Sequence, residues 1–139
     1  MYKFSAYYVP ATDEESARAH CKRFCVENDI DFEDMVKVMT VTGSKDEVLS
    51  DIVRMILADS RLNDVEPHKD FVIFHYNGIK FIAGWIPGPS DVVLFTVGYE
   101  IEGKRRVKVL RSTGSDNIFK EMFDNIEKCE KEYLKDIEK

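Results

Sequence analysis

The sequence has few cysteines and no long apolar run, and both features exclude whole classes of protein. Its three cysteines, Cys21, Cys25 and Cys129, are odd in number and include a pair at helical spacing, which argues against a disulfide scaffold. No apolar stretch approaches the roughly 18 residues that cross a bilayer, and the N-terminus lacks the segments of a secretion signal. We therefore expect a cytoplasmic protein that contacts no membrane.

Recognisable catalytic and metal-binding motifs are also missing. The sequence contains no G-x-S-x-G, no H-E-x-x-H, no Walker A spacing and no short C-x2-C pair. Cys21 and Cys25 lie one helical turn apart, and His20 points about 100° away from Cys21, so we interpret the two cysteines as small core residues. We expect no metal, no cofactor and no covalent catalysis, which favours a binding protein over an enzyme.

The negative charge is concentrated in the first half of the chain. Twenty basic and 26 acidic residues give a net charge of −6, and residues 1–70, with 15 acids and 9 bases, carry all of it. Five acids fall within eight residues and form what we call the acidic segment: Glu27, Asp29, Asp31, Glu33 and Asp34. Such a surface repels phosphate backbones, which disfavours nucleic acid, and it attracts a partner protein with a basic surface.

Hydrophobic periodicity predicts one α+β domain over residues 1–139. Strands are expected at 2–9, 35–41, 71–76, 79–86, 92–101 and after residue 103. Helices are expected from a capping box at Thr12 to about residue 27, from a second box at Ser44, and from Gly114 onward. A loop is expected at 63–67. The order is strand, helix, strand, helix, four strands and helix, with a mostly antiparallel sheet packed by helices.

Two hairpins set the expected register of the second half. Asn77 and Gly78 between apolar runs predict a two-residue type I′ turn. This turn pairs Tyr76 with Ile79, Phe74 with Phe81, Ile73 with Ile82, and His75 with Lys80. A three-residue loop at 102–104 in the next hairpin pairs Tyr99 with Val107, Val97 with Val109, and Glu100 with Arg106. That register keeps the apolar side chains of both strands on one face.

Two further groups of residues are candidates for binding a ligand other than a protein. The turn at Gly43 and Ser44 opens a helix, where backbone N–H groups can hold an anion, and a neutral His75 beside Lys80 can act as a base or simply cap the sheet. These residues define one alternative, a small-molecule or nucleotide-binding protein or small enzyme. The basic hairpin 104–111 defines another, an RNA-contacting protein, through these residues: Lys104, Arg105 and Arg106. The same charges also protect an edge strand from aggregation.

Three apolar residues are candidates for contacting a protein partner. Trp85 precedes the rigid Pro87-Gly88-Pro89 loop, where it either projects to a partner or ends a strand in the core. Tyr133 and Ile137 extend the apolar stripe of the last helix. We predict that this stripe outruns the sheet and forms a homodimer or a partner groove.

The arrangement of the last two thirds of the chain is similar to a known class of binding proteins. Over residues 44 to 139, a helix, an antiparallel sheet and a closing amphipathic helix resemble type III secretion chaperones in outline. Small acidic inhibitors and immunity proteins share the composition. The resemblance implies an acidic protein-binding module of inhibitor, immunity or chaperone type that engages a basic surface of its partner.

Overall fold

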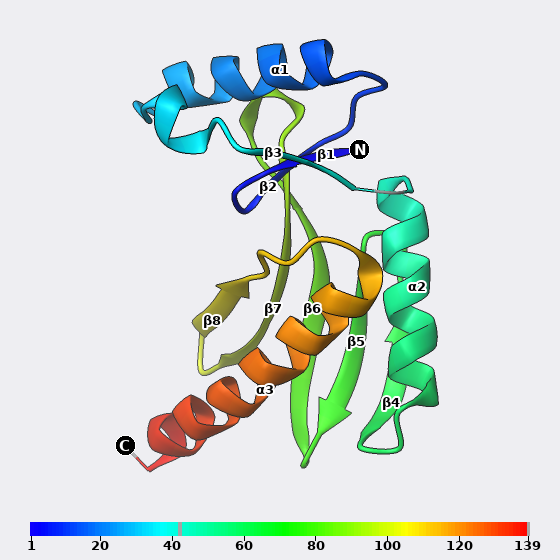
Figure 1. Ribbon diagram of the computed structural model, residues 1–139. Helices are drawn as coiled ribbons and strands as arrows, with labels where there is room; N and C mark the ends of the chain where they lie inside the picture. Colours follow the sequence, from blue (N-terminus) through cyan, green and yellow to red (C-terminus); the bar gives the residue numbers. More distant parts are fainter. Residues whose placement is uncertain (42, 139) are drawn as a thin grey trace.

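The strands of the protein join in one sheet, with helices packed against it. The structure, a computed structural model, describes residues 1–41 and 43–138, and for Asp91 it describes the backbone alone. Within this part, three α-helices and an eight-stranded, mostly antiparallel sheet form the α+β fold that the sequence predicts (Figure 1). The strand order is β3-β1-β2-β7-β6-β5-β4, and β8 also pairs with β7.

The first expected strand is divided in two. Residues 2–9 form β1 (Tyr2–Phe4) and β2 (Tyr7–Val9), which pair with each other because Ser5 adopts a φ of 51° and the chain turns back. Strand β3 (Val38–Thr40) pairs with β1 on its other side. The prediction of a single strand is therefore wrong. The aromatic run holds neither of the residues, Gly or Pro, that most clearly mark a turn.

Helix α1 (Glu14–Glu27) begins slightly later than the capping box predicts. Asp13, rather than Thr12, is its N-cap, and the Asp13 carboxylate accepts a hydrogen bond of 2.8 Å from the Ser16 N–H. The expected apolar stripe is confirmed as buried: Ala17, Cys21, Phe24 and Cys25. A short 3-10 helix, η1 (Phe32–Met35), then takes Met35 out of the strand expected at 35–41.

Strand β4 (Leu62–Pro67) occupies the place of the loop expected at 63–67. It follows α2 (Lys45–Ala58), whose N-cap Ser44 accepts a hydrogen bond from the Glu47 N–H as the capping box predicts. The pairing of β4 with β5 shifts between Asn63 and Glu66, and Asp64 there has a φ of 50°. A bulge and a terminal proline are typical of an edge strand, so a polar and turn-like sequence still pairs with its neighbour.

The two hairpins of the second half differ in how well the sequence predicts them. Strands β5 (Phe71–Tyr76) and β6 (Ile79–Pro87) pair in the expected register, including His75 with Lys80. Strands β7 (Val93–Ile101) and β8 (Lys104–Val109) instead pair Tyr99 with Arg106 and Glu100 with Arg105. The three-residue loop is wrong, because Glu102 and Gly103 form a two-residue turn with φ of 49° and 80°.

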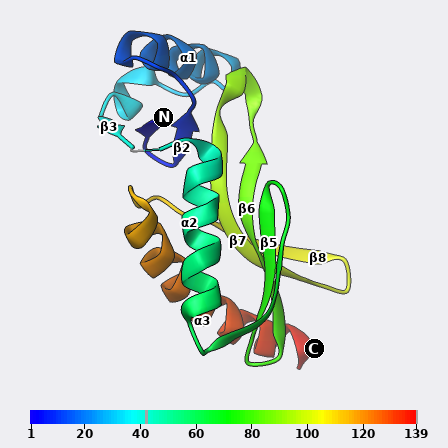
Figure 2. The ribbon, with the colours of Figure 1, turned by 90° about the vertical axis from the view of Figure 1, so that its right-hand side faces the viewer.

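Helices α2 and α3 (Ser115–Ile137) pack on the same face of the sheet (Figure 2). The main core lies between them and the strands, and it contains large side chains such as Phe74, Phe81 and Ile126. A second, smaller core lies between α1 and the β1–β2 hairpin, around Phe4 and Phe24. The 3-10 turn η2 (Pro89–Asp91) joins β6 to β7 near α1.

None of the helices in the described ranges is long and apolar enough to cross a membrane.

Candidate functional site

The face of the sheet opposite α2 and α3 is open to solvent. Because side chains alternate along a strand, the residues of β5 to β8 that do not point at the helices point to this face. We call it the open face and define it by these apolar members: Phe71, Ile73, Ile82, Ile86, Leu94, Val107 and Val109. All are half-buried except Val107, which is 38% exposed. An uncovered sheet face with apolar side chains is therefore the candidate interaction surface of the fold.

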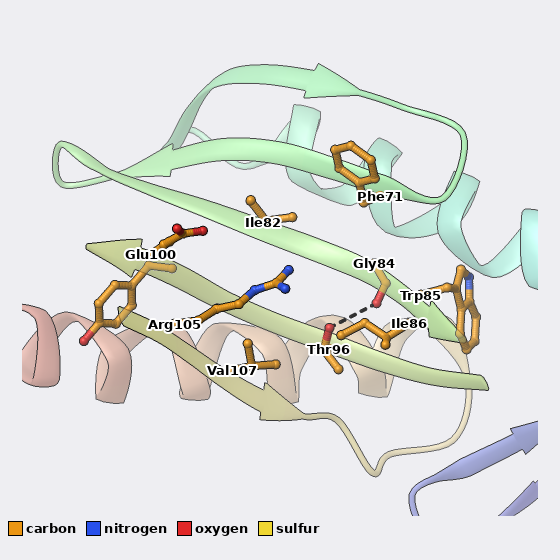
Figure 3. A pocket seen from close by; sticks show the side chains of 11 residues that line it. Phe71, Ile82, Gly84, Trp85, Ile86, Thr96, Glu100, Arg105 and Val107 are labelled. Atoms are coloured by element: carbon orange, nitrogen blue, oxygen red, sulfur yellow. Dashed lines mark hydrogen bonds between the residues drawn. The ribbon is translucent and has the colours of Figure 1, made fainter. Parts of the chain in front are cut away.

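Two glycines form a hollow in the middle of the open face (Figure 3). Gly84 of β6 and Gly98 of β7 lie on neighbouring strands, since Gly84 pairs with Thr96 and Gly98 pairs with Ile82. Their missing side chains leave a space of about 190 Å³ between walls that include Phe71, Ile86 and Val107. A Cβ atom on Gly98 would overlap the Arg106 carbonyl oxygen, so the close approach of the strands requires glycine here.

Three polar side chains border the hollow. The Thr96 hydroxyl donates a hydrogen bond of 3.4 Å to the Gly84 carbonyl, and Glu100 and Arg105 stand opposite each other on β7 and β8 (Figure 3). No cysteine, histidine or lysine lines it. The hollow thus combines apolar walls with one hydroxyl, one carboxylate and one guanidinium group at its border.

The structure does not bring the candidate ligand residues into one pocket. His75 and Lys80 pair near the β5–β6 turn, whereas Ser44 caps α2 near the other end of β6, where the Trp85 indole reaches the Lys45 carbonyl. Lys80 and Trp85 are five residues apart on one strand, which spans about 17 Å. The residues proposed for a small-molecule or nucleotide site, His75, Lys80 and the Gly43-Ser44 turn, therefore lie at opposite ends of β6.

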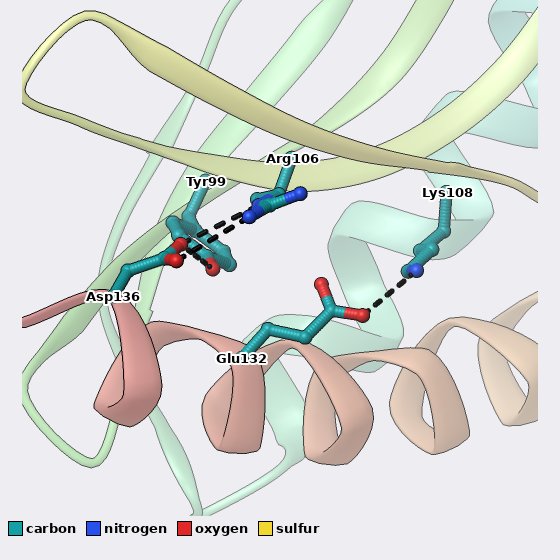
Figure 4. A network of polar contacts seen from close by, with 5 residues as sticks. All are labelled: Tyr99, Arg106, Lys108, Glu132 and Asp136. Carbon is teal, nitrogen blue, oxygen red and sulfur yellow. Dashed lines mark hydrogen bonds and ion pairs between the residues drawn. The ribbon is translucent and has the colours of Figure 1, made fainter.

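The corrected register also divides the basic hairpin between two faces. Lys104 lies at the turn and Arg105 on the open face, whereas Arg106 and Lys108 point to α3 (Figure 4). The Lys108 ammonium lies 3.0 Å from the Glu132 carboxylate. Arg106 and Lys108 of the basic hairpin are thus paired with carboxylates of α3, which leaves a weaker positive surface than the sequence predicts.

Asp136 is the centre of this contact between α3 and the sheet. It accepts a hydrogen bond of 2.9 Å from the Tyr99 hydroxyl and lies 3.3 Å from the Arg106 guanidinium (Figure 4). Arg106 and then Tyr99 hold the pKa of the Asp136 carboxyl below its ordinary value. Burial, reinforced by Asp136, raises the pKa of the Tyr99 phenol. The end of α3 is therefore fixed to the sheet by polar contacts.

We expect Tyr99→Phe to lower the free energy of unfolding by about 1 to 2 kcal/mol, because it removes a hydrogen bond to a carboxylate and keeps the ring packed. Urea unfolding followed by circular dichroism measures this change. Tyr133→Phe is the matched control, since the Tyr133 ring packs edge-on against Tyr99 with centroids 5.4 Å apart. An equal loss in both variants would contradict a specific role for the Asp136 contact.

The aromatic and apolar partner candidates have different positions. Trp85 is only 6% exposed and donates its indole N–H to the Lys45 carbonyl at 3.0 Å, so it is a core residue, one of the two readings that the sequence allows. Tyr133 is half-buried against Tyr99, which shows that α3 does not outrun the sheet there. Ile137 remains 52% exposed at the helix end, and the homodimer through this helix stays a prediction.

The acidic segment lies on the surface, from the end of α1 through η1. Its five carboxylates are exposed. Glu27 accepts a hydrogen bond of 2.6 Å from the Ser90 hydroxyl of η2, and Asp31 accepts one of 3.0 Å from the Glu33 N–H. Neither contact neutralises a charge, so the segment keeps its negative field.

Sequence reasoning missed one buried charge, that of Lys3. This residue is 1% exposed on β1, and its ammonium donates to the Ser112 carbonyl and stands 4.7 Å from the centroid of the Tyr8 ring. Burial lowers the pKa of Lys3 to about 8, although Glu121 opposes the shift. The available signal was a lysine within the aromatic run at 2–9, and the structure buries both faces of β1 there, since Lys3 and its neighbour Phe4 are both buried.

Histidine, cysteine, aspartate and glutamate side chains can together hold a metal ion. Among the described residues, no three or more histidines, cysteines, aspartates or glutamates converge. All three cysteines are free and buried, and burial raises the pKa of the Cys129 thiol to about 11. Such a thiol is a poor nucleophile.

Comparison of the chain with protein-family models, with curated proteins and with solved structures finds no match.

Proposed function

We propose that the protein is an acidic protein-binding module that docks a basic partner protein on its open face. The observation that carries the proposal is the solvent-open apolar sheet with a hollow of about 190 Å³ at its centre. Pockets for drug-sized molecules usually measure about 300 to 1,000 Å³. The smaller hollow suits one apolar side chain of a partner, inserted between the walls formed by Phe71 and Val107.

The charge distribution supports a basic partner. The net charge is −6, and the acidic segment is exposed. Within residues 1–41 and 43–138, the ion pairs of the structure join other side chains and leave these five carboxylates out. Opposite charges raise the rate at which two proteins meet, whereas buried apolar contacts supply most of the affinity. On this proposal the acidic segment speeds association and the open face holds the partner.

The test compares a variant on the open face with a control variant on the outer surface of α2. Ile82→Glu places a charge beside the hollow, and Leu57→Glu places the same charge on α2, where Leu57 is 61% exposed. We expect a basic protein, bound in stoichiometric amount by the wild type, to bind Leu57→Glu equally and Ile82→Glu at least about 30-fold more weakly, as for a central contact residue. Affinity chromatography followed by titration calorimetry measures both.

A second experiment tests the acidic segment separately from the open face. Replacing Asp29, Asp31, Glu33 and Asp34 by Asn or Gln should slow association at low salt, less at high salt, and leave dissociation unchanged. Equal binding of the partner by wild type and Ile82→Glu would overturn docking on the open face. Unchanged association rates at low salt would remove the acidic segment from the proposal.

A further inference from the structure

The second core holds three sulfur atoms in one place. Cys21 and Cys25 lie one turn apart on α1 and are 0% and 1% exposed. Met35 comes from η1, and its Sδ atom lies 3.4 Å from the Cys25 Sγ atom. Helix α1 and η1 are joined by a short reversal of the chain, so the fold, rather than a sequence motif, brings the thioether to Cys25 and into the same core cluster as Cys21 (Figure 1).

The chemistry of these donors selects the ion they can hold. Both thiols are free, and thiolate with thioether sulfur is the soft donor set that prefers monovalent copper. Zinc in a structural site takes four ligands, and hard cations take oxygen, so three sulfurs alone suit neither. We propose that Cys21, Cys25 and Met35 together bind one Cu(I) ion in a three-coordinate sulfur site.

Binding exchanges protons for the metal without any change of oxidation state. Cu(I) forms a bond to each cysteine sulfur, both thiol protons leave to solvent, and the Met35 thioether adds as a neutral donor. Burial and the neighbouring Cys25 raise the pKa of Cys21 to about 12, and the Arg18 guanidinium opposes the shift.

The site lies close to the surface. Half-buried Ile30 and Phe32 pack against this core from the segment that contains η1. Displacement of this segment, with α1 left folded, is therefore the entry path that we infer for the ion.

The experiment titrates the reduced full-length chain with Cu(I) against bicinchoninate under anaerobic conditions. We expect one ion per chain, no binding at this site in Cys21→Ser, and unchanged binding in Cys129→Ser, which alters a buried cysteine of the other core. Met35→Leu keeps an apolar side chain of similar volume. Removing a residue that only hydrogen-bonds to a metal ligand already lowers metal affinity about tenfold. Met35→Leu removes a direct ligand and should therefore lower the affinity for Cu(I) at least about tenfold.

Copper X-ray absorption of the loaded protein gives an independent readout. Three sulfur neighbours in the wild type and two in Met35→Leu are the expected result. Circular dichroism of each variant confirms that it folds. Three outcomes would overturn the proposal: no binding by folded wild type, equal affinity in Met35→Leu, or a comparable loss in Cys129→Ser, which would mark nonspecific binding to thiols.

Discussion

Replacing Gly98 by Ala should destabilise the protein by about 3 kcal/mol, the upper end of what overpacking costs. Intrinsic strand propensity alone predicts that Gly98→Ala stabilises the protein, because glycine within a strand is about 0.5 to 1 kcal/mol less favourable than alanine. The local geometry decides between them. A Cβ atom at this position would overlap the Arg106 carbonyl oxygen and lie 3.0 Å from the Val107 Cα.

The expected loss is large because both obstacles are backbone atoms. A side chain can rotate away from a new methyl group, but the Arg106 carbonyl belongs to β8, which pairs with β7 along six residue pairs. Relief therefore requires β7 and β8 to separate locally. Gly84→Ala should behave in the same way, because its Cβ would overlap the Asp70 carbonyl oxygen.

Urea unfolding and thermal scans of both glycine variants measure the effect, with an expected fall in Tm of roughly 10 °C. Thr96→Ala is the matched control on the same face, since it shortens a side chain instead of adding one. It should lose about 1 kcal/mol or less, for its weak hydrogen bond. Stability equal to or above that of wild type in Gly98→Ala would show that the strands accommodate a methyl group.

The sequence predicted those parts of the fold that local patterns determine. The Asn77-Gly78 turn sets its hairpin register without help from the rest of the chain, and the stripe around Phe24 identifies the buried face of α1. The β7–β8 register could not be found in this way. Hydrophobic alternation favoured burying Val107, but the two-residue turn directs Val107 to the open face and Arg106 toward α3, where Asp136 of that distant helix pairs with it.

The candidate site was still less predictable, for the same physical reason. The hollow depends on Gly84 and Gly98 lying side by side, which follows only from the pairing of β6 with β7. Within the sequence each is an isolated glycine in an apolar strand, and such a residue indicates a bulge or a close approach without saying which. The acidic segment, by contrast, needs no tertiary information, because charge at a loop is exposed by default.

A second large effect is expected at Lys3, where a substitution should raise stability. Lys3→Met should increase the free energy of unfolding at pH 7 by about 2 kcal/mol, because it replaces a buried charge with an apolar side chain of similar length. The substitution removes the hydrogen bond from the Lys3 ammonium to the Ser112 carbonyl, but this carbonyl has a second donor. The Tyr8 hydroxyl also donates to the Ser112 carbonyl, at 2.8 Å, so that oxygen stays satisfied.

The pH dependence of this effect distinguishes buried charge from improved packing. The pKa of Lys3 is lowered from 10.5 to about 8 in the folded protein. Below pH 8 both states hold the proton, and folding carries the full cost of burying the charge. Between pH 8 and 10.5 the unfolded chain binds more protons than the folded one, so the wild type gains stability as the pH rises. The advantage of Lys3→Met over the wild type should therefore shrink with rising pH.

Urea unfolding of both proteins at pH 7 and pH 9.5 measures this difference. The raised pKa of the Cys21 and Cys129 thiols destabilises both proteins above about pH 9, and comparison of the two at each pH cancels that contribution. Lys22→Met, at an exposed position of α1, is the control and should show a small difference that is independent of pH. A Lys3→Met protein less stable than wild type at pH 7 would mean that the contacts of the ammonium with Ser112 and Tyr8 outweigh its loss of hydration.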